Sequence, residues 1–537
     1  MAAKSIRHRI PVSLRHYWKL VAGSIGLVAV LTLVVGTVRA TALVYSDANE
    51  GFVVTNDIQG TVDLFDTDVA HEISLSYSDA DFEEMKATFE ESGEKEWIKA
   101  DITIDGVTIS DVGIRLKGNS TLSALGGGMT MGGDGEDGER QFPGGGEMPE
   151  GMGLPEGMEM PADGGQMPGG MGGGSGSSVS FDSPEGLPWL IDFAKYVDGQ
   201  VYQGNQQISL RVESAMGGGS TLNEAVALEL IEASGEASYD WNYSTVSVNG
   251  SEGVTRRVVD VMDATWAEEE YGANAGVLYK ALSTGSFEYQ GDDPDDYTDD
   301  FKQVTMEGSA DVQPIVDFLK WLGEADDATF DAELGDWVDI ASFANYTALQ
   351  NLLANGDDMA GPGKNFYLWY DYETGLISIV TWDVDLTLQS ADLAPDETAS
   401  LGGGTGGGGF PGQAADEAAT DGAATDETAT AETQTQGQMP GGGEMPEGMA
   451  EGGMGGGMGG NELKERFLAS EAFQDEYMAA YNELYDSLFA SGTALEAVET
   501  AAAAAEANGA DVADAAETLK ATVQQRTEFL ASELAAG

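Results

Sequence analysis

Two groups of oxygen-bearing side chains in the middle of the chain are of the type that binds a divalent cation beside a phosphate. The first group is the adjacent pair Asp357 and Asp358, followed by Asn365, and the second is Asp383 and Asp385. Magnesium in proteins is commonly held by one or two carboxylates together with substrate phosphates. If the fold brings the two groups together, they predict a metal–nucleotide site.

A predicted β-hairpin lies between these groups and supplies the means of bringing them together. Residues 366–370 and 376–381 are runs of mainly apolar, strand-forming residues, and residues 371–375 between them are turn formers. A hairpin of this length returns the chain toward its starting point. We therefore expect the polar residues before the hairpin to lie near the acidic residues after it.

Phosphoryl transfer also needs a cation on the phosphates and a group that positions it. Within residues 112–117, apolar residues alternate with Arg115 and Lys117, which therefore share one face of a predicted strand. Glu224 lies one turn into a later predicted helix, and we expect it to form an ion pair with Lys117. A solvated acidic loop is the competing interpretation of the Asp-Asp pair before the hairpin.

The overall charge excludes one large class of function. The chain has 93 acidic and 24 basic residues, which gives a formal net charge of −69. A nucleic-acid-binding protein needs a basic surface, so we expect no nucleic acid among the partners. Cysteine is absent from the sequence, which excludes disulfides and thiolate metal sites.

The N-terminal residues have the features of an export segment. Basic residues and no acids occupy residues 1–19, and Leu20 to Val38 is an uncharged apolar run long enough to cross a bilayer. Basic residues before such a run predict a cytoplasmic N-terminus and an exported remainder. Val38-Arg-Ala40 and Ala40-Thr-Ala42 both look like signal-peptide cleavage sites. We expect either a membrane-anchored protein with an extracellular domain or, after cleavage, a secreted protein.

Two tracts of low complexity interrupt the chain. Residues 125–179 are dominated by Gly, Met, Pro and Glu, and residues 391–460 contain an Ala/Thr/Glu/Asp section followed by a similar Gly/Met section. Such compositions bury too little apolar surface to offset the entropy of ordering, so we predict flexible, disordered linkers. Binding of copper(I) by the methionines is a less favoured interpretation, because their spacing is irregular and no histidine joins them.

The remaining segments show a mixture of strand and helix signals. Asp105-Gly106 predicts a hairpin turn within residues 102–109, and Gly235 predicts the end of a helix at 221–234 that Ser220 caps. Further predicted strands are 71–77, 187–193, 207–212 and 243–248, and further predicted helices are 79–92, 311–323, 328–354 and most of 461–536 with a break near Asn508-Gly509.

Several motifs, in this order, resemble those of the CotH family of spore-coat-type kinases over roughly residues 70–390 and the helical C-terminal segment. They are Gly113-Ile-Arg-Leu-Lys-Gly-Asn-Ser120, Leu222-Asn-Glu-Ala225, Asn355-Gly-Asp-Asp358, Asn365-Phe-Tyr-Leu-Trp-Tyr370 and Trp382-Asp-Val-Asp385. The resemblance implies an atypical protein-kinase-like fold of class α+β, with a β-rich N-lobe and a mainly helical C-lobe. It also implies ATP and Mg²⁺ or Mn²⁺ as cofactors, and Ser/Thr of a surface or coat protein as the acceptor.

The resemblance also implies roles for individual residues. Asp357 or Asp358 is the base, and the choice stays open because residues 361–363 lengthen the interval to Asn365. Asn365 and Asp383 hold the metal and Lys117 contacts phosphate. The predicted site is completed by Asp385 as a further metal ligand and by Arg115 and Glu224 at the nucleotide.

These features predict a division of the chain into six segments. They are a basic tail with a membrane or signal segment (1–45), the first part of the N-lobe (46–124), a disordered insertion (125–179), the kinase-like core (180–390), a disordered linker (391–460) and a helical segment that packs on the core (461–537).

Two other functions compete with the kinase interpretation. A non-catalytic surface, adhesion or structural protein would explain the export signal and the long acidic tracts, although such a protein has no reason to keep the complete set of acids. A calcium-binding surface module would also use acidic loops. We find no Asp-x-Asp-x-Asp-Gly loop followed by a glutamate, which disfavours this second alternative.

Overall fold

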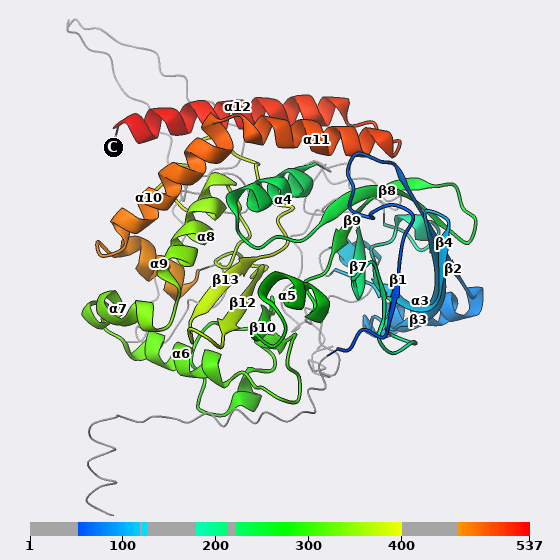
Figure 1. Ribbon diagram of the computed structural model, residues 1–537, viewed down its shortest axis with the longest axis horizontal. Helices are drawn as coiled ribbons and strands as arrows, with labels where there is room; N and C mark the ends of the chain where they lie inside the picture. The colour runs from blue at the N-terminus through cyan, green and yellow to red at the C-terminus, as the bar shows by residue number, and fades with distance from the viewer. Residues whose placement is uncertain (1–51, 119–120, 126–178, 213–221, 400–459, 537) are drawn as a thin grey trace, which may run out of the picture. The chain divides into compact units, whose positions relative to one another are not determined.

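The computed structural model of the protein describes residues 52–118, 121–125, 179–212, 222–399 and 460–536 (Figure 1). All of them belong to one compact unit, Glu50–Gly537. The predicted N-terminal export segment, and the predicted linkers apart from their ends, lie outside the described residues. Ten α-helices and three β-sheets occur within the described ranges, which confirms the predicted α+β class.

The largest sheet has seven strands and closes on itself. Its strands are, in order, β2 (His71–Tyr77), β3 (Ile98–Ile104), β4 (Val107–Leu116), β5 (Trp189–Asp192), β7 (Gln207–Arg211), β9 (Val254–Asp260) and β8 (Trp241–Val248). Neighbouring strands are antiparallel except for β2 and β8, which pair in parallel and close the ring. Alternate side chains point inward and form a separate hydrophobic core.

Local turn and cap residues explain the first elements of this sheet. Asp105 and Gly106 have φ angles of 49° and 82°, the left-handed pair that a two-residue hairpin turn requires, so the predicted hairpin is confirmed between β3 and β4. The predicted helix is α3 (Asp79–Ser92), which Ser78 caps and Gly93 ends in a left-handed conformation. Strands β1 (Asn56–Ile58) and β6 (Gln200–Tyr202) form a separate parallel pair.

A second, antiparallel sheet carries the predicted central hairpin. Its order is β11 (Phe301–Gln303), β10 (Gly276–Ala281), β12 (Phe366–Asp371) and β13 (Ile377–Thr381). The pairing of β12 with β13 around the 371–375 turn confirms the hairpin that the sequence predicts. The hydrophobic core around this second sheet is larger than the core of the closed sheet. It also includes residues of α4 (Asn223–Ser234), α5 (Ala264–Tyr271), α6 (Gln313–Glu324) and α8 (Ile340–Leu352).

One helix prediction is wrong. The sequence pattern predicts a single helix over 328–354, but the chain forms α7 (Asp327–Glu333), a short 3₁₀ turn at Leu334–Asp336 and then α8. Asp339 caps α8 by accepting a bond from the backbone N–H of Ser342 at 3.1 Å. Helix α8 ends at Leu352, and the loop that follows it carries the acidic pair.

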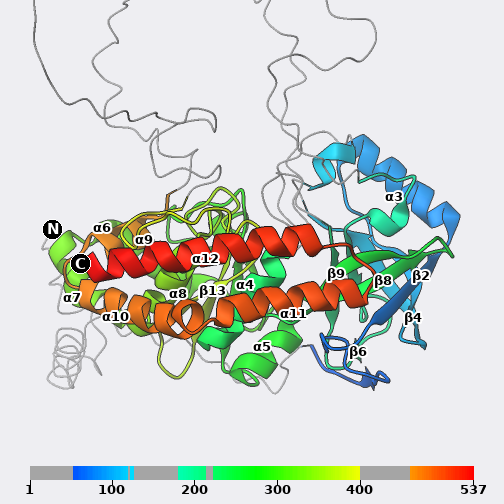
Figure 2. The same ribbon diagram turned by 90° about the horizontal axis from the view of Figure 1, so that it is seen from above.

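The C-terminal residues form α9 (Glu462–Ala469), α10 (Gln474–Leu484), a π-helical turn (Tyr485–Ala490), α11 (Thr493–Ala507) and α12 (Ala513–Ala536). Helix α10 packs on α8, and α11 packs on both α4 and α12 (Figures 1 and 2). The predicted break at Asn508 is confirmed, and the buried Asn508 side chain accepts a bond from the backbone N–H of His71 on β2 at 2.9 Å.

Residues 391–399, which their composition assigns to a linker, have a described structure. Arg526 of α12 is fully buried and donates to the carbonyl oxygens of Ala391 and Leu393. It also donates to the carbonyl oxygens of Asn351 and Leu352 at the end of α8. One side chain therefore ties the last helix to two segments that flank the central hairpin.

Helices long and apolar enough to span a membrane do not occur in the described part of the chain. The predicted span, Leu20 to Val38, lies before it.

Candidate active site

Asp357 lies in the loop that follows α8 and is held by its own loop. Its carboxylate accepts bonds from the backbone N–H of Gly363 at 2.6 Å and from the side-chain amide of Asn365 at 3.0 Å. Burial raises the pKa of Asp357 to about 6 despite the bond from Gly363, and the nearby charge of Asp383 adds to the rise. A carboxylate with a pKa in this range can accept a proton near neutral pH.

Asp358, the neighbouring residue, faces different partners. Its carboxylate forms an ion pair with Lys464 of α9 and accepts a bond from the backbone N–H of Ala360 at 2.8 Å. Only 3% of Asp358 is exposed. The two aspartates that the sequence leaves as alternatives therefore occupy distinct environments, and Asp357 is the one that contacts Asn365.

The strand end after the hairpin places Asp383 beside the loop of Asp357. Phe366 pairs with Thr381 in the hairpin, so Asn365 and Asp383 lie at the same end of it, and Asn365 contacts Asp357. Asp383 is partly exposed and forms an ion pair with Arg211 at 3.1 Å. Burial and the Asp383 carboxylate together raise the pKa of Asp385, two residues further along the chain, to about 8. The structure therefore brings polar groups from both ends of the hairpin together.

Glu224 on α4 has partners other than the predicted one. It is almost fully buried and forms ion pairs with Arg211 of β7, at 3.2 Å, and with Arg257 of β9. It also accepts a bond from the hydroxyl of Tyr239 at 2.8 Å. Burial alone would raise the pKa of Glu224, but the two guanidinium groups lower it below its usual value. Glu224 therefore pairs with Arg211 and Arg257, two bases that the sequence did not assign to it.

Three basic side chains surround the indole ring of Trp382, which directly precedes Asp383. The amine of Lys117 lies 5.0 Å from the ring centroid, the guanidinium carbon of Arg211 5.2 Å and the amine of Lys280 5.5 Å. They come from the end of β4, from β7 and from β10, so both sheets contribute. In so acidic a chain, three cations at one point form a site suited to an anionic ligand.

Arg115, the other predicted basic residue, is placed differently. Its guanidinium carbon lies 5.0 Å from the ring centroid of Trp97. The amine of Lys195 lies 5.1 Å from the same ring. Lys117 directly follows the last residue of β4, and Arg115 and Lys117 contact different aromatic rings.

The predicted metal ligands are Asn365, Asp383 and Asp385. Among the described residues, no three or more acidic or histidine side chains are grouped so as to hold a metal ion. Asn365 and Asp383 nevertheless suit a magnesium ion that takes its other ligands from water and substrate phosphates.

The comparison with known families decides the classification. The model of the CotH kinase protein family matches residues 185–532. This chain belongs to the CotH kinase family. No curated protein sequence matches it.

The CotH match covers most of the residues described above. It begins just before β5 and includes Arg211, Glu224, the loop of Asp357 and Asn365, Asp383 and Lys464. Arg115 and Lys117 precede the matched range. The relation to CotH kinases therefore includes the acidic residues on both sides of the hairpin.

Sequence reasoning missed several residues that the structure brings to this candidate site: Arg211, Tyr239, Arg257, Lys280 and Lys464. The scarcity of basic residues is the signal that could have pointed to four of them. Arg211 ends a strand that the sequence does predict. No local pattern indicates which of the many carboxylates each base contacts.

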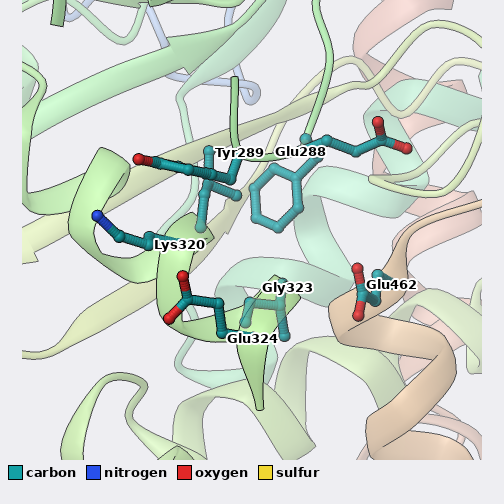
Figure 3. A pocket seen from close by; sticks show the side chains of 9 residues that line it. Glu288, Tyr289, Lys320, Gly323, Glu324 and Glu462 are labelled. Carbon is teal, nitrogen blue, oxygen red and sulfur yellow. The ribbon is translucent and has the colours of Figure 1, made fainter. Parts of the chain in front are cut away.

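A pocket of about 260 Å³ lies elsewhere in the protein (Figure 3). It is lined by residues of α6, of the first turn of α9 and of the segment around Tyr289, among them the apolar Phe287, Leu319 and Leu322. Its labelled residues include Glu288, Lys320, Glu324 and Glu462, whose charged groups lie around its edge. None of the eight predicted site residues lines this pocket.

Proposed function

We propose that this protein is a metal-dependent kinase that transfers the γ-phosphate of ATP to Ser or Thr of a protein substrate. The observation that carries the proposal is the convergence of Asp357 and Asn365 with Asp383 across the hairpin, beside the three cations at Trp382. This set supplies the base, the metal ligands and the phosphate-binding cations that phosphoryl transfer requires.

The proposal includes a kinase-like division of the fold. In it, the closed sheet with α4 corresponds to the N-lobe, and the second sheet with α8 and the C-terminal helices corresponds to the C-lobe. One hydrophobic core lies inside the closed sheet and the other includes the second sheet and α8, which supports a division between the two sheets. The buried residues of α4 belong to the second core, so α4 packs against the C-lobe side. The Arg211–Glu224 pair supports it as well, because kinases position their phosphate-binding cation with a helix glutamate.

The chemistry assigns one proton transfer to Asp357. The substrate hydroxyl oxygen attacks the γ-phosphorus, the bond from that phosphorus to the bridging oxygen breaks, and ADP leaves with the bonding pair. Asp357 accepts the hydroxyl proton, and Asn365 orients its carboxylate by donating to it. Asp358 is not the base in this scheme, because Lys464 neutralises its buried charge.

The nucleotide is held by the remaining residues. Lys117, Arg211 and Lys280 attract the phosphates, and Glu224 fixes the position of Arg211. Asn365 and Asp383 would hold Mg²⁺ or Mn²⁺, with Asp385 as a further oxygen donor. A bound divalent cation neutralises the charge that develops on the phosphates.

We further propose that the reaction takes place outside the cell on a surface or coat protein. Support comes from the N-terminal sequence alone, in which basic residues precede the apolar run Leu20 to Val38. The N-terminal sequence is compatible both with attachment to the membrane through this segment and with secretion after its cleavage.

The test is transfer of labelled phosphate from ATP by the purified protein with Mg²⁺ or Mn²⁺, together with calorimetric nucleotide binding. We expect Asp383→Ala to abolish metal-dependent nucleotide binding. We expect Asp357→Ala to reduce transfer about 10²- to 10⁴-fold with binding retained, because it removes only the base. Glu373→Ala, an exposed acid in the turn of the same hairpin, is the matched control and should change neither.

The outcomes separate the two main functions. Transfer by the wild type that Asp357→Ala abolishes supports the kinase. A wild-type protein that neither binds nucleotide nor transfers phosphate with any divalent metal supports the non-catalytic scaffold instead.

A further inference from the structure

Lys464 connects the C-terminal segment to the loop that carries the proposed base. It lies on α9 and forms a buried ion pair with Asp358, 106 residues earlier in the chain. The exposed fractions are 6% for Lys464 and 3% for Asp358. A pair this deeply buried is screened little by solvent, so each charge depends on the other.

The helix α9 is docked by contacts that do not involve the Lys464 amine. Leu463 and Phe467 are fully buried, and the ring of Phe467 lies 4.8 Å from that of Phe343 on α8, edge to face. Asn461 caps the helix through the backbone N–H of Lys464. The position of α9 is therefore set by apolar packing and by its cap, and the amine is directed at Asp358 from a fixed support.

The loop receives further contacts around Asp358. The backbone N–H of Gly460, just before α9, donates to the carbonyl of Ala360 at 2.8 Å. The hydroxyl of Tyr346 on α8 accepts a bond from the N–H of Met359 at 3.2 Å. Residues 358–360 are therefore held between α8 and α9, and Asp357 is joined to them by one peptide bond.

Loss of the Lys464 charge would leave the Asp358 carboxylate buried and unneutralised. A buried charge in that state is strongly unfavourable, so the loop would move to bring the carboxylate to water. Any such movement displaces Asp357, because the two residues are adjacent. A displacement of about 1 Å in a reacting group can reduce a rate about 10²-fold.

We propose that Lys464 is a positioning residue for the base Asp357, acting through Asp358. The proposal rests on the kinase function proposed above. Lys464 contacts neither the three basic side chains around Trp382 nor the predicted metal ligands. Its effect on catalysis would therefore pass through Asp358.

The test compares the steady-state kinetics of K464M with those of the wild type. We expect kcat to fall about 10²-fold, while KM for ATP changes less than about threefold. KM is retained because Lys117, Arg211, Lys280 and Asp383 lie on other elements. The matched control is K520M, which breaks the exposed Lys520–Glu499 pair of 2.8 Å and should change neither constant.

A second variant distinguishes positioning from a general loss of structure. D358N/K464M removes both charges, and the asparagine that replaces Asp358 keeps a side-chain oxygen that can accept from the N–H of Ala360. We expect the kcat of this double variant to be at least tenfold higher than that of K464M. If K464M does not fold, the double variant carries the test, with kcat within about tenfold of the wild type as the expected result.

Three results would overturn the proposal. The first is an unchanged kcat in K464M, and the second is a K464M variant in which only KM for ATP changes. The third is a double variant whose kcat is as low as that of K464M. Where K464M does not fold, the third result is a double variant whose kcat is about 10²-fold below that of the wild type. An active wild type with any of these results refutes only the role of Lys464. A wild type without phosphate transfer refutes the kinase function itself, and the role of Lys464 with it.

Discussion

Asp383 adopts a backbone conformation that residues other than glycine rarely adopt. Its φ is 56°, in the left-handed region, which costs an L-residue about 1–2 kcal/mol. Strain of this kind persists where surrounding contacts enforce it, and such positions cluster at functional sites. The ion pair of Asp383 with Arg211 is one such contact. The strained residue is also the one to which we assign the metal.

Buried aspartates also occur away from this site, and Asp263 shows their effect on stability. Asp263 caps α5 by accepting from the backbone N–H groups of Thr265 and Trp266 through one oxygen. Its other carboxylate oxygen is buried without a hydrogen-bond partner. Burial raises the pKa of Asp263 to about 6 against the opposing hydrogen bonds.

This shift predicts the direction of a pH dependence. The folded protein binds the Asp263 proton more tightly than the unfolded chain does, so the resulting stability is present below about pH 4 and is lost as the pH rises through about 6. Asp263→Asn cannot undergo this loss and keeps the capping oxygen. We expect it to raise the free energy of unfolding at pH 8 by roughly 1–3 kcal/mol, measured by urea denaturation.

The matched control for Asp263 is Asp326, which caps α7 from an exposed position. Its hydrogen bonds to Thr329 hold the pKa of Asp326 below its usual value, so its carboxylate stabilises the fold at neutral pH. Asp326→Asn should therefore give no gain at pH 8. A loss of stability in Asp263→Asn at this pH would contradict the assignment.

At the scale of elements, the start of α8 determines where the candidate loop begins. Asp339 supplies the cap that separates α8 from the preceding 3₁₀ turn. We expect Asp339→Ala to lower the free energy of unfolding by about 1 kcal/mol, because one backbone N–H of the first turn loses its acceptor. Urea denaturation measures the difference.

The control for the cap is Asp336→Ala, an exposed position in the 3₁₀ turn. It should change the free energy of unfolding by less than about 0.5 kcal/mol. Equal losses in the two variants would show that charge, and not capping, is responsible.

At the scale of the whole molecule, the net charge of −69 acts against the compact state. Salt screens this repulsion, with a Debye length that falls from about 30 Å at 0.01 M to about 10 Å at 0.1 M. We expect Tm, followed by circular dichroism, to rise by several degrees between these two concentrations of NaCl. KCl should have the same effect, since screening does not depend on the identity of the cation.

A Tm that falls with added salt would mean that attractive ion pairs outweigh the repulsion. The buried ion pairs of Glu224 with Arg211 and Arg257, and of Asp358 with Lys464, are attractive interactions near the site. Because solvent screens buried pairs little, they should contribute almost equally at both salt concentrations.

The sequence alone determined the features that depend on neighbouring residues. The β12–β13 hairpin, the Asp105-Gly106 turn and the limits of α3 follow from turn chemistry, caps and periodicity, which act within a few residues. The convergence of Asp357 with Asp383 follows from the hairpin as well. The prediction of a kinase-like α+β fold came only from the family motifs.

Tertiary structure alone decided the pairing of charges. The chain offers 93 acids to 24 bases, so each base has many carboxylates among which to choose. Arg211 and Arg257 meet Glu224, and Lys464 meets Asp358 from 106 residues away, because strands, helices and apolar packing bring their backbones together. Contacts of this range carry no signal in the local sequence. The adjacent aspartates Asp357 and Asp358 therefore acquire different partners only in the folded protein.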